Sequence, residues 1–164
     1  MDSLGVMMLG LVSIVSTSVH FFSYNYMCGD SNLIRFFSLL SLFTFFMFIL
    51  ISSDNFLVLF FGWEGIGVCS FLLISFWQTR LSAIKSALKA IVLNRIGDSA
   101  YIGAISFIFL LFKSCDFSVV FSLIPLVADK YFVFFNFNVS YIETISFLFL
   151  IGSIGKSAQL GLHG

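Results

Sequence analysis

The chain has 164 residues, of which 60% are hydrophobic and 10% are charged. Soluble domains are about 45–50% apolar, so this composition excludes an ordinary soluble domain and indicates an integral membrane protein surrounded by lipid. Eight basic residues balance eight acidic residues, for a formal net charge of zero. This balance gives no electrostatic basis for binding nucleic acid.

Long apolar runs predict helices that cross the membrane. The lengths of these runs are close to the ~20 residues that span a hydrocarbon core. The runs are apolar on all sides and do not alternate between polar and apolar residues, which favours helices over barrel strands. We expect an all-α membrane protein in a single domain over residues 1–164. Its predicted helices cover about residues 4–26, 34–53, 55–77, 82–112 and 141–163.

Short polar segments separate the first three helices. Ser31 or Asn32 can cap the start of the second helix, and the segment 52–55 can cap the start of the third helix. His20, near the end of the first helix, is either an interfacial histidine or a proton-relay group.

The segment from Thr79 to Arg95 is rich in basic residues and contains no acid. By the positive-inside rule this end lies on the matrix or cytoplasmic side. Lys85 and Lys89 share one helical face. They either extend to the interface and set orientation, or they are buried cations of a charged axis across the membrane.

The segment 116–130 holds an apolar run that is too short to span. We expect an interfacial or re-entrant element there, broken at Pro125. The aromatic segment Tyr131–Ser140 is predicted to be a loop in the aromatic belt of the membrane.

The third predicted helix carries one charge, Glu64, near its middle. A carboxylate at that depth is costly and marks a functional path by default. Gly62, Gly65 and Cys69 form a thin stripe beside Glu64 on which another helix can pack. Asp98 follows Arg95 by three residues, and is either in a local salt bridge or an intramembrane carboxylate.

The last predicted helix places Lys156 among three glycines, Gly152, Gly155 and Gly161. Glycines weaken a helix, and discontinuous helices expose backbone to ion sites, so we expect this helix to be discontinuous. A buried lysine there needs an anionic partner.

The sequence shows no nucleotide-binding loop and no nucleophile–base arrangement. The cysteines Cys28, Cys69 and Cys115 lack the spacing of metal ligands. We therefore expect this chain to bind no NADH, flavin, iron–sulfur cluster or metal, and a quinone site is not expected in it.

Three motifs occur in a particular order: GWEGIGVCSFLLISFW at 62–77, KSALKAIVLNRIGD at 85–98 and GKSAQLGLH at 155–163. Together they resemble the antiporter-like membrane subunits of respiratory complex I, over essentially the whole chain. The resemblance implies a partial antiporter-like helix bundle in the mitochondrial inner membrane. It also implies proton translocation coupled to quinone reduction elsewhere in the complex, where other subunits would use NADH, FMN, iron–sulfur clusters and ubiquinone.

The resemblance also assigns roles to residues. Glu64 matches the glutamate that pairs with a lysine on a broken helix, Lys156 matches that lysine, and His163 matches a relay group. Asp98 matches an acidic position that modulates the site, and Lys85 and Lys89 are weaker candidates. When such a pair opens, the lysine loses its counter-charge in an apolar medium and releases its proton.

Relative to the family pattern, the chain begins near the third helix and ends within the first of two repeats. We expect a second chain to supply the remainder beside other complex I membrane-arm subunits, or else a degenerate fragment kept for packing. Two other functions stay open. The chain could serve a multi-chain cation/proton antiporter, or be a structural membrane fragment without a complete proton path.

Overall fold

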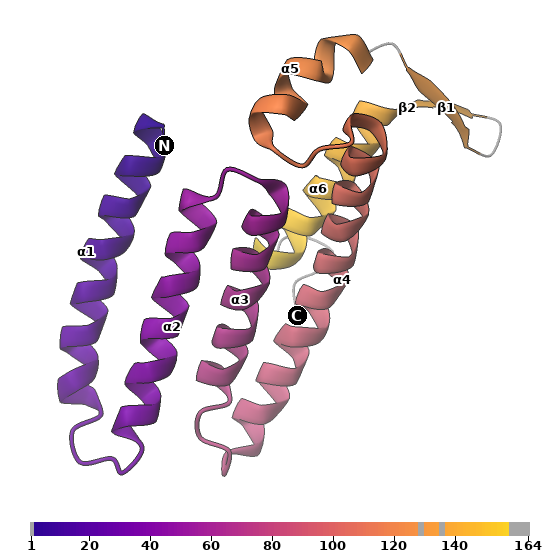
Figure 1. Ribbon diagram of the computed structural model, residues 1–164. Coiled ribbons are helices and arrows are strands. Elements are labelled where there is room, and N and C mark those ends of the chain that lie inside the picture. The colour runs from indigo at the N-terminus through magenta and orange to yellow at the C-terminus, as the bar shows by residue number, and fades with distance from the viewer. Residues whose placement is uncertain (1, 128–129, 135–136, 158–164) are drawn as a thin grey trace. The chain divides into compact units, whose positions relative to one another are not determined.

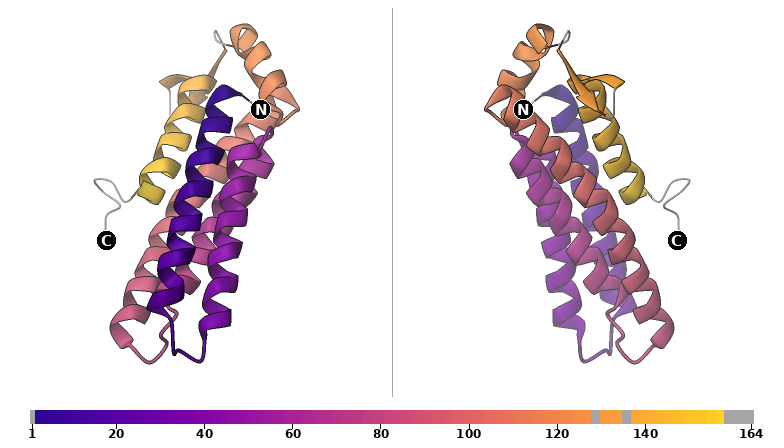
Figure 2. Two further views of the ribbon diagram at one scale, coloured as in Figure 1. Left: turned by 90° about the vertical axis from the view of Figure 1, so that its left-hand side faces the viewer. Right: turned by 90° about the vertical axis from the view of Figure 1, so that its right-hand side faces the viewer.

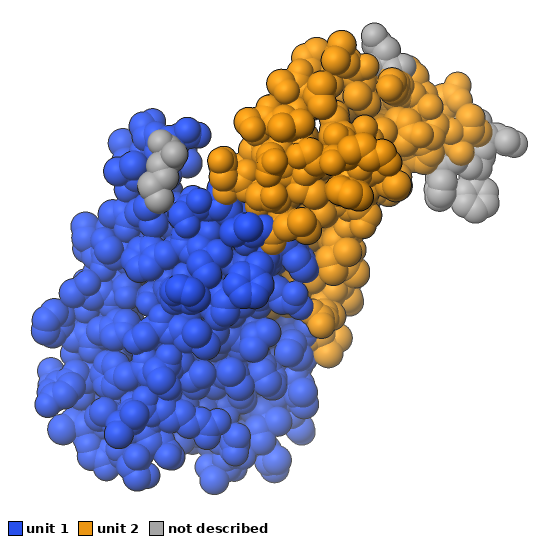
Figure 3. Space-filling model, in the orientation of Figure 1, with its two compact units in different colours: residues 1–53, 58–91 blue, residues 54–57, 92–164 orange. Residues whose placement is uncertain are grey.

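The computed structural model describes residues 2–127, 130–134 and 137–157. Over these residues the chain forms the following elements (Figure 1): α1 (Ser3–Tyr26), α2 (Leu33–Ser52), α3 (Phe56–Ile74), α4 (Leu81–Phe112), α5 (Phe117–Val127), β1 (Tyr131–Phe134), β2 (Phe137–Ser140) and α6 (Tyr141–Ser157). The fold divides into two compact units (Figure 3). Unit 1 is residues 1–53 with 58–91, and unit 2 is residues 54–57 with 92–164.

Four of the described helices, α1 to α4, are long and apolar enough to cross a membrane. The predicted helical membrane fold is thereby confirmed. The first four helices begin and end within a turn of the predicted residues, and the predicted end of the last helix, residue 163, lies outside the described residues. That helix, α6, is continuous from Tyr141 to Ser157 and passes through Gly152 and Gly155 without a break. A break beyond Ser157 lies outside the described residues.

Unit 1 contains antiparallel helices joined by tight connections (Figures 1 and 2). The turn after α1 uses Gly29 at φ 101°, a conformation that favours glycine. Asn32 is the residue that precedes α2, as predicted, but its side chain makes no capping hydrogen bond. Asn55 does act as predicted, because its Oδ1 accepts from the Leu57 amide at 2.9 Å.

In unit 2 the segment before α3 is tied to the segment before α5. The Phe56 amide donates to the Cys115 carbonyl at 3.0 Å, and the Phe117 amide donates to the Asp54 carbonyl at 3.3 Å. The Asn55 Nδ2 donates to Asp116 Oδ1 at 2.9 Å. These bonds satisfy donors that helix starts leave without an intrahelical partner.

Next to this junction, α5 packs on the C-terminal end of α4 and forms a hydrophobic cluster with it. The buried residues of this cluster are Ile108, Phe112, Val120 and Val127. The prediction that Pro125 breaks the element is wrong, since α5 runs through it. Proline removes one helical hydrogen bond, and the helix ends two residues later.

The segment predicted to be an aromatic-belt loop is an antiparallel hairpin, with Tyr131 opposite Ser140 and Phe132 opposite Val139. A purely α-helical description is therefore incomplete. The physical reason is that aromatic and β-branched residues, which favour strands, make up most of this segment. Ser140 then caps α6, because its Oγ accepts from the Glu143 amide at 3.1 Å.

Candidate functional site

Glu64 lies on α3 in unit 1 and is half-buried. The glycines on either side of it bring α3 close to α2. A Cβ at Gly62 would lie 2.9 Å from the Leu50 backbone nitrogen, and one at Gly65 would overlap the Phe46 ring. The predicted stripe for close helix packing is confirmed, and it places the carboxylate beside an α2–α3 contact.

Asp98 lies on α4 in unit 2 and is only 6% exposed. Its neighbour Gly97 lies directly against α6: a Cβ there would lie 3.1 Å from the Gly152 carbonyl oxygen and 3.2 Å from Gly155 Cα. Among the described residues, every buried side-chain nitrogen or oxygen has a hydrogen-bond partner. Asp98 is therefore a buried, satisfied carboxylate, as expected of an intramembrane acid.

Lys156 follows Gly155 directly and lies half-buried in the last described turn of α6. The contact between Gly97 and Gly155 therefore brings the backbone next to Asp98 close to the backbone next to Lys156. A cation in the last turn also suits the negative end of the helix dipole. Unit 2 thus places an acid and a base at one helix crossing.

The other predicted site residues are not part of this crossing. Lys85 and Lys89 are exposed on the part of α4 that belongs to unit 1, and His163 lies outside the described residues. Glu64 belongs to unit 1 and Lys156 to unit 2, and their pairing stays a prediction.

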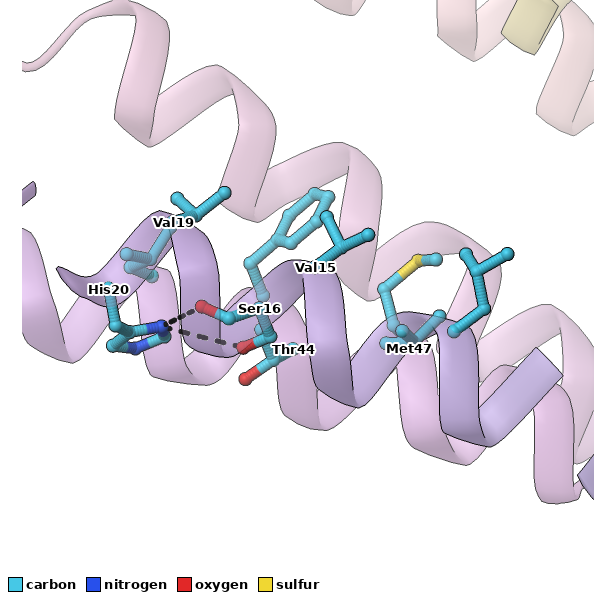
Figure 4. Close-up of a pocket in the computed structure, with 10 residues that line it drawn as sticks. Val15, Ser16, Val19, His20, Thr44 and Met47 are labelled. Carbon is cyan, nitrogen blue, oxygen red and sulfur yellow. Dashed lines mark hydrogen bonds between the residues drawn. The ribbon is translucent and has the colours of Figure 1, made fainter. Parts of the chain in front are cut away.

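His20 lines a groove of about 230 Å³ between α1 and α2 (Figure 4). Its Nδ1 lies 2.7 Å from the Ser16 carbonyl oxygen. Because a carbonyl only accepts, Nδ1 carries a proton. The Nε2 lies 3.4 Å from Ser41 Oγ on α2, so the imidazole bridges two helices.

The sequence reasoning missed Gly97. It singled out the glycines of α6, but not the one on α4 that meets them. The available signal was the position of Gly97 directly before the acid Asp98, since small residues mark close helix contacts in membranes. Among the described residues, no group of three or more His, Cys, Asp or Glu side chains could hold a metal.

These observations define a class of protein. Two of the helices that can cross a membrane carry a half-buried glutamate and a buried aspartate, and α6 carries a half-buried lysine, all beside glycine-mediated contacts. Such an arrangement is typical of proteins that move ions or protons across membranes.

Comparison with known proteins gives the family. Residues 53–164 match the transmembrane family of NADH:quinone oxidoreductase and Mrp antiporters, and residues 1–37 match the N-terminal region of complex I chain 5. The chain belongs to this NADH:quinone oxidoreductase/Mrp antiporter family.

Individual relatives agree with this assignment. The chain is 51% identical over 162 residues to NADH-ubiquinone oxidoreductase chain 5 of Dictyostelium citrinum, covering 99% of this chain and 24% of the relative. It is 48% identical over 163 residues to NADH-quinone oxidoreductase subunit L of Rickettsia bellii, covering 99% of this chain and 25% of the relative. The chain thus spans about a quarter of the length of these relatives.

Proposed function

We propose that this chain is part of the proton-translocating membrane arm of mitochondrial NADH:ubiquinone oxidoreductase. In this role it moves protons through buried charged groups, coupled to quinone reduction elsewhere in the complex. The observation that carries the proposal is the family match over residues 53–164, because that segment contains Glu64, Asp98 and Lys156.

The geometry of unit 2 supports a proton-transfer role for Lys156. An ammonium in an apolar medium keeps its proton only while an anion offsets the cost of its burial. Asp98 supplies a carboxylate at the same helix crossing, and Glu64 is the proposed partner from α3. Movement of either acid away from Lys156 would favour release of the lysine proton to water or to His163.

Lys85 and Lys89 are candidate groups for the entry or exit of protons. They lie one turn apart on α4, and both are exposed. Because lysine is charged and strongly hydrated, such side chains can hold water near the opening of a path.

The proposal places the chain in the mitochondrial inner membrane, as a multi-pass protein among other membrane-arm subunits. A second chain would supply the remainder of the antiporter-like subunit. NADH, FMN, iron–sulfur clusters and ubiquinone would be bound by other subunits, since the family matched over residues 53–164 is a transmembrane one.

The test uses the assembled complex that contains this chain. Glu64→Gln, Asp98→Asn and Lys156→Met each remove a charge at nearly constant size. Loss of a proton-relay group slows transfer by about 10²–10⁴-fold, so each variant should translocate fewer protons per NADH oxidised. Proton uptake by sealed vesicles and NADH oxidation give this ratio, and a native gel reports assembly.

Lys130→Gln is the matched control, because Lys130 is an exposed cation just before the hairpin. It should leave the ratio unchanged. If Glu64 and Lys156 act as one unit, the double variant should lower the ratio no further than either single variant. An assembled Lys156→Met complex with an unchanged ratio would refute the proposal.

A second candidate is a subunit of a multi-chain cation/proton antiporter. It is favoured by the matched family itself, which includes Mrp antiporters. Purification of the native assembly separates the two functions: NADH-oxidising subunits that copurify with this chain support complex I. An assembly that lacks them and exchanges cations for protons supports the antiporter.

A further inference from the structure

Unit 2 contains an apolar cavity of about 260 Å³, called here the unit 2 cavity. Residues of α3, α4, α5 and α6 line it, among them, in that order, Phe56, Phe112, Val120 and Ile145. Every lining side chain is a hydrocarbon except that of Ser146, whose Oγ donates to the Glu143 carbonyl at 2.9 Å. The lining side chains therefore present no charge, and their one hydroxyl proton is already in a hydrogen bond.

Ring contacts and hydrogen bonds hold the walls of the unit 2 cavity in place. The Phe56 ring stacks on the Phe149 ring of α6, with centroids 5.6 Å apart, and meets the Phe117 ring of α5 edge to face at 4.5 Å. The Phe56 amide also donates to the Cys115 carbonyl. These contacts fix α5, which covers one side of the cavity, against the start of α3 and against α6.

The lining of the unit 2 cavity indicates the chemical class of its ligand. An apolar cavity of about 150 Å³ stays dry and binds benzene, so water is a poor occupant of this larger apolar space. An empty space would deprive the lining atoms of van der Waals contacts. A hydrocarbon restores those contacts without leaving a polar group unsatisfied.

The unit 2 cavity is continuous with a surface that faces lipid. Phe121 lines the cavity and is 62% exposed, and Ser146 lines it and is exposed as well. The helix that carries Phe121, α5, has eleven residues and is apolar, too short to cross a membrane. An apolar helix of this length lies at the edge of the hydrocarbon layer, so lipid acyl chains reach the opening at Phe121 and Ser146.

The volume of the unit 2 cavity separates an acyl chain from a further helix. One turn of an α-helix with its side chains is about 10 Å wide and 5.4 Å long, which corresponds to about 400 Å³. This volume exceeds the 260 Å³ of the cavity. A single acyl chain is thin and flexible, and it is the hydrocarbon that surrounds a membrane protein.

We propose that the unit 2 cavity binds an acyl chain of a membrane phospholipid. The chain enters past Phe121 and Ser146 and packs against Phe112, Val120 and Ile145. It fills the space beside α5 and thereby anchors this short helix to the lipid. Because no charge lines the cavity, the acyl chain is bound and the headgroup is not selected. The site is independent of the proposed proton path, whose residues it does not include.

The test uses the full chain in nanodiscs of phosphatidylcholine that include phosphatidylcholine with a diazirine on one acyl chain. Light converts the diazirine to a carbene that inserts into neighbouring side chains, and mass spectrometry locates the insertion. Val120 and Ile108 line the cavity but are buried, so lipid outside the cavity does not reach them, and both should be labelled. Val127 and Ile105 are also buried but do not line it, and should stay unlabelled. Phe109 is exposed on α4 and reports contact with surrounding lipid.

A matched pair of variants tests the opening of the cavity. Ser146→Phe places a ring at the opening and should abolish labelling of Val120 while labelling of Phe109 is retained. Ser153→Phe is the control, because Ser153 is an exposed serine of the same helix that makes the same kind of bond, to the Leu150 carbonyl at 2.8 Å, and does not line the cavity. It should leave the labelling of Val120 unchanged. Circular dichroism confirms equal helix content in both variants.

Four outcomes would overturn the proposal. The first is a wild-type chain labelled at Phe109 but not at Val120, and the second is an equal loss of Val120 labelling in Ser146→Phe and Ser153→Phe. The third is loss of Val120 labelling on addition of unlabelled palmitic acid with Phe109 unaffected, which would assign the cavity to a free fatty acid. The fourth is labelling of Val120 in the isolated chain that disappears in the assembled complex, which would assign the cavity to a side chain of a neighbouring protein.

Discussion

The contact between Gly97 on α4 and the glycines of α6 yields a sharp prediction about packing. In Gly97→Ala, the new Cβ would lie 3.1 Å from the Gly152 carbonyl oxygen and 3.2 Å from Gly155 Cα. Both neighbours are backbone atoms, so no side-chain rotation can relieve the contact. The two helices must separate by a few tenths of an ångström, which also displaces Asp98 and Lys156.

The magnitude follows from two opposing terms. Alanine improves the helix propensity of α4 by about 1 kcal/mol relative to glycine. Overpacking costs about 1–3 kcal/mol, so the net effect of Gly97→Ala is a loss of stability between about 0 and 2 kcal/mol. Gly103→Ala on the same helix is the matched control, because its Cβ would make an ordinary contact at 3.7 Å from Leu148 Cδ1.

Thermal or denaturant unfolding of the chain in lipid nanodiscs, followed by circular dichroism, compares the two variants. The helix-propensity gain is common to both, so their difference isolates the cost of the contact. Gly97→Ala should be less stable than Gly103→Ala by about 1–3 kcal/mol. Equal stability of the two variants would show that α4 and α6 do not meet at Gly97.

Two predictions concern the junction between the segments before α3 and α5. Burial, and then the negative charge of Asp116, raise the pKa of the Cys115 thiol above its usual value of 9.0. In detergent at pH 8, Cys115 should therefore react with iodoacetamide more slowly than the exposed Cys28. The raised pKa of Cys115 contributes stability to the fold below pH 9, and this contribution is lost as the pH rises through the higher pKa of the folded state. A faster reaction of Cys115 than of Cys28 would contradict the raised pKa and the pH dependence that follows from it. Asn55→Ala removes the hydrogen bonds to Asp116 and to the Leu57 amide. It should lower the free energy of unfolding, measured by denaturant titration, by about 1–2 kcal/mol. An unchanged unfolding midpoint would mean that water replaces both hydrogen bonds at no cost.

Much of the site could be predicted from residue type and spacing. Glu64 stands out because it is the only charge in its apolar run. The small residues beside it predict a close contact with another helix, which the structure shows to be α2. Lys156 stands out because it follows the uncharged apolar run 144–155 and lies next to Gly155. In an apolar medium a charge must be compensated, so its position alone carries information.

Long-range contacts could not be predicted in the same way. Gly97 meets α6 across more than fifty residues of sequence, and its place before Asp98 marks it as a candidate contact without saying which helix it meets. The bond between Asn55 and Asp116 is equally remote in sequence. Such contacts depend on where two helices cross, which periodicity does not encode.

Local structure also departed from expectation where tertiary context decides. Pro125 lies within α5 because α5 packs on α4 and this contact compensates for one lost hydrogen bond. The hairpin after α5 is a different case, because its own aromatic and β-branched residues favour strands where a surface loop was predicted.

By itself, the sequence determined that this is a multi-pass helical membrane protein, where its first four spans lie, and which charged residues lie within apolar segments. The physical reason is that an apolar surrounding imposes helices and penalises every uncompensated charge. Only the tertiary structure decided that Asp98 is buried beside the α4–α6 crossing and that Gly62 on α3 packs against Leu50 on α2. Those juxtapositions arise from helix packing, which brings together residues that are far apart along the chain.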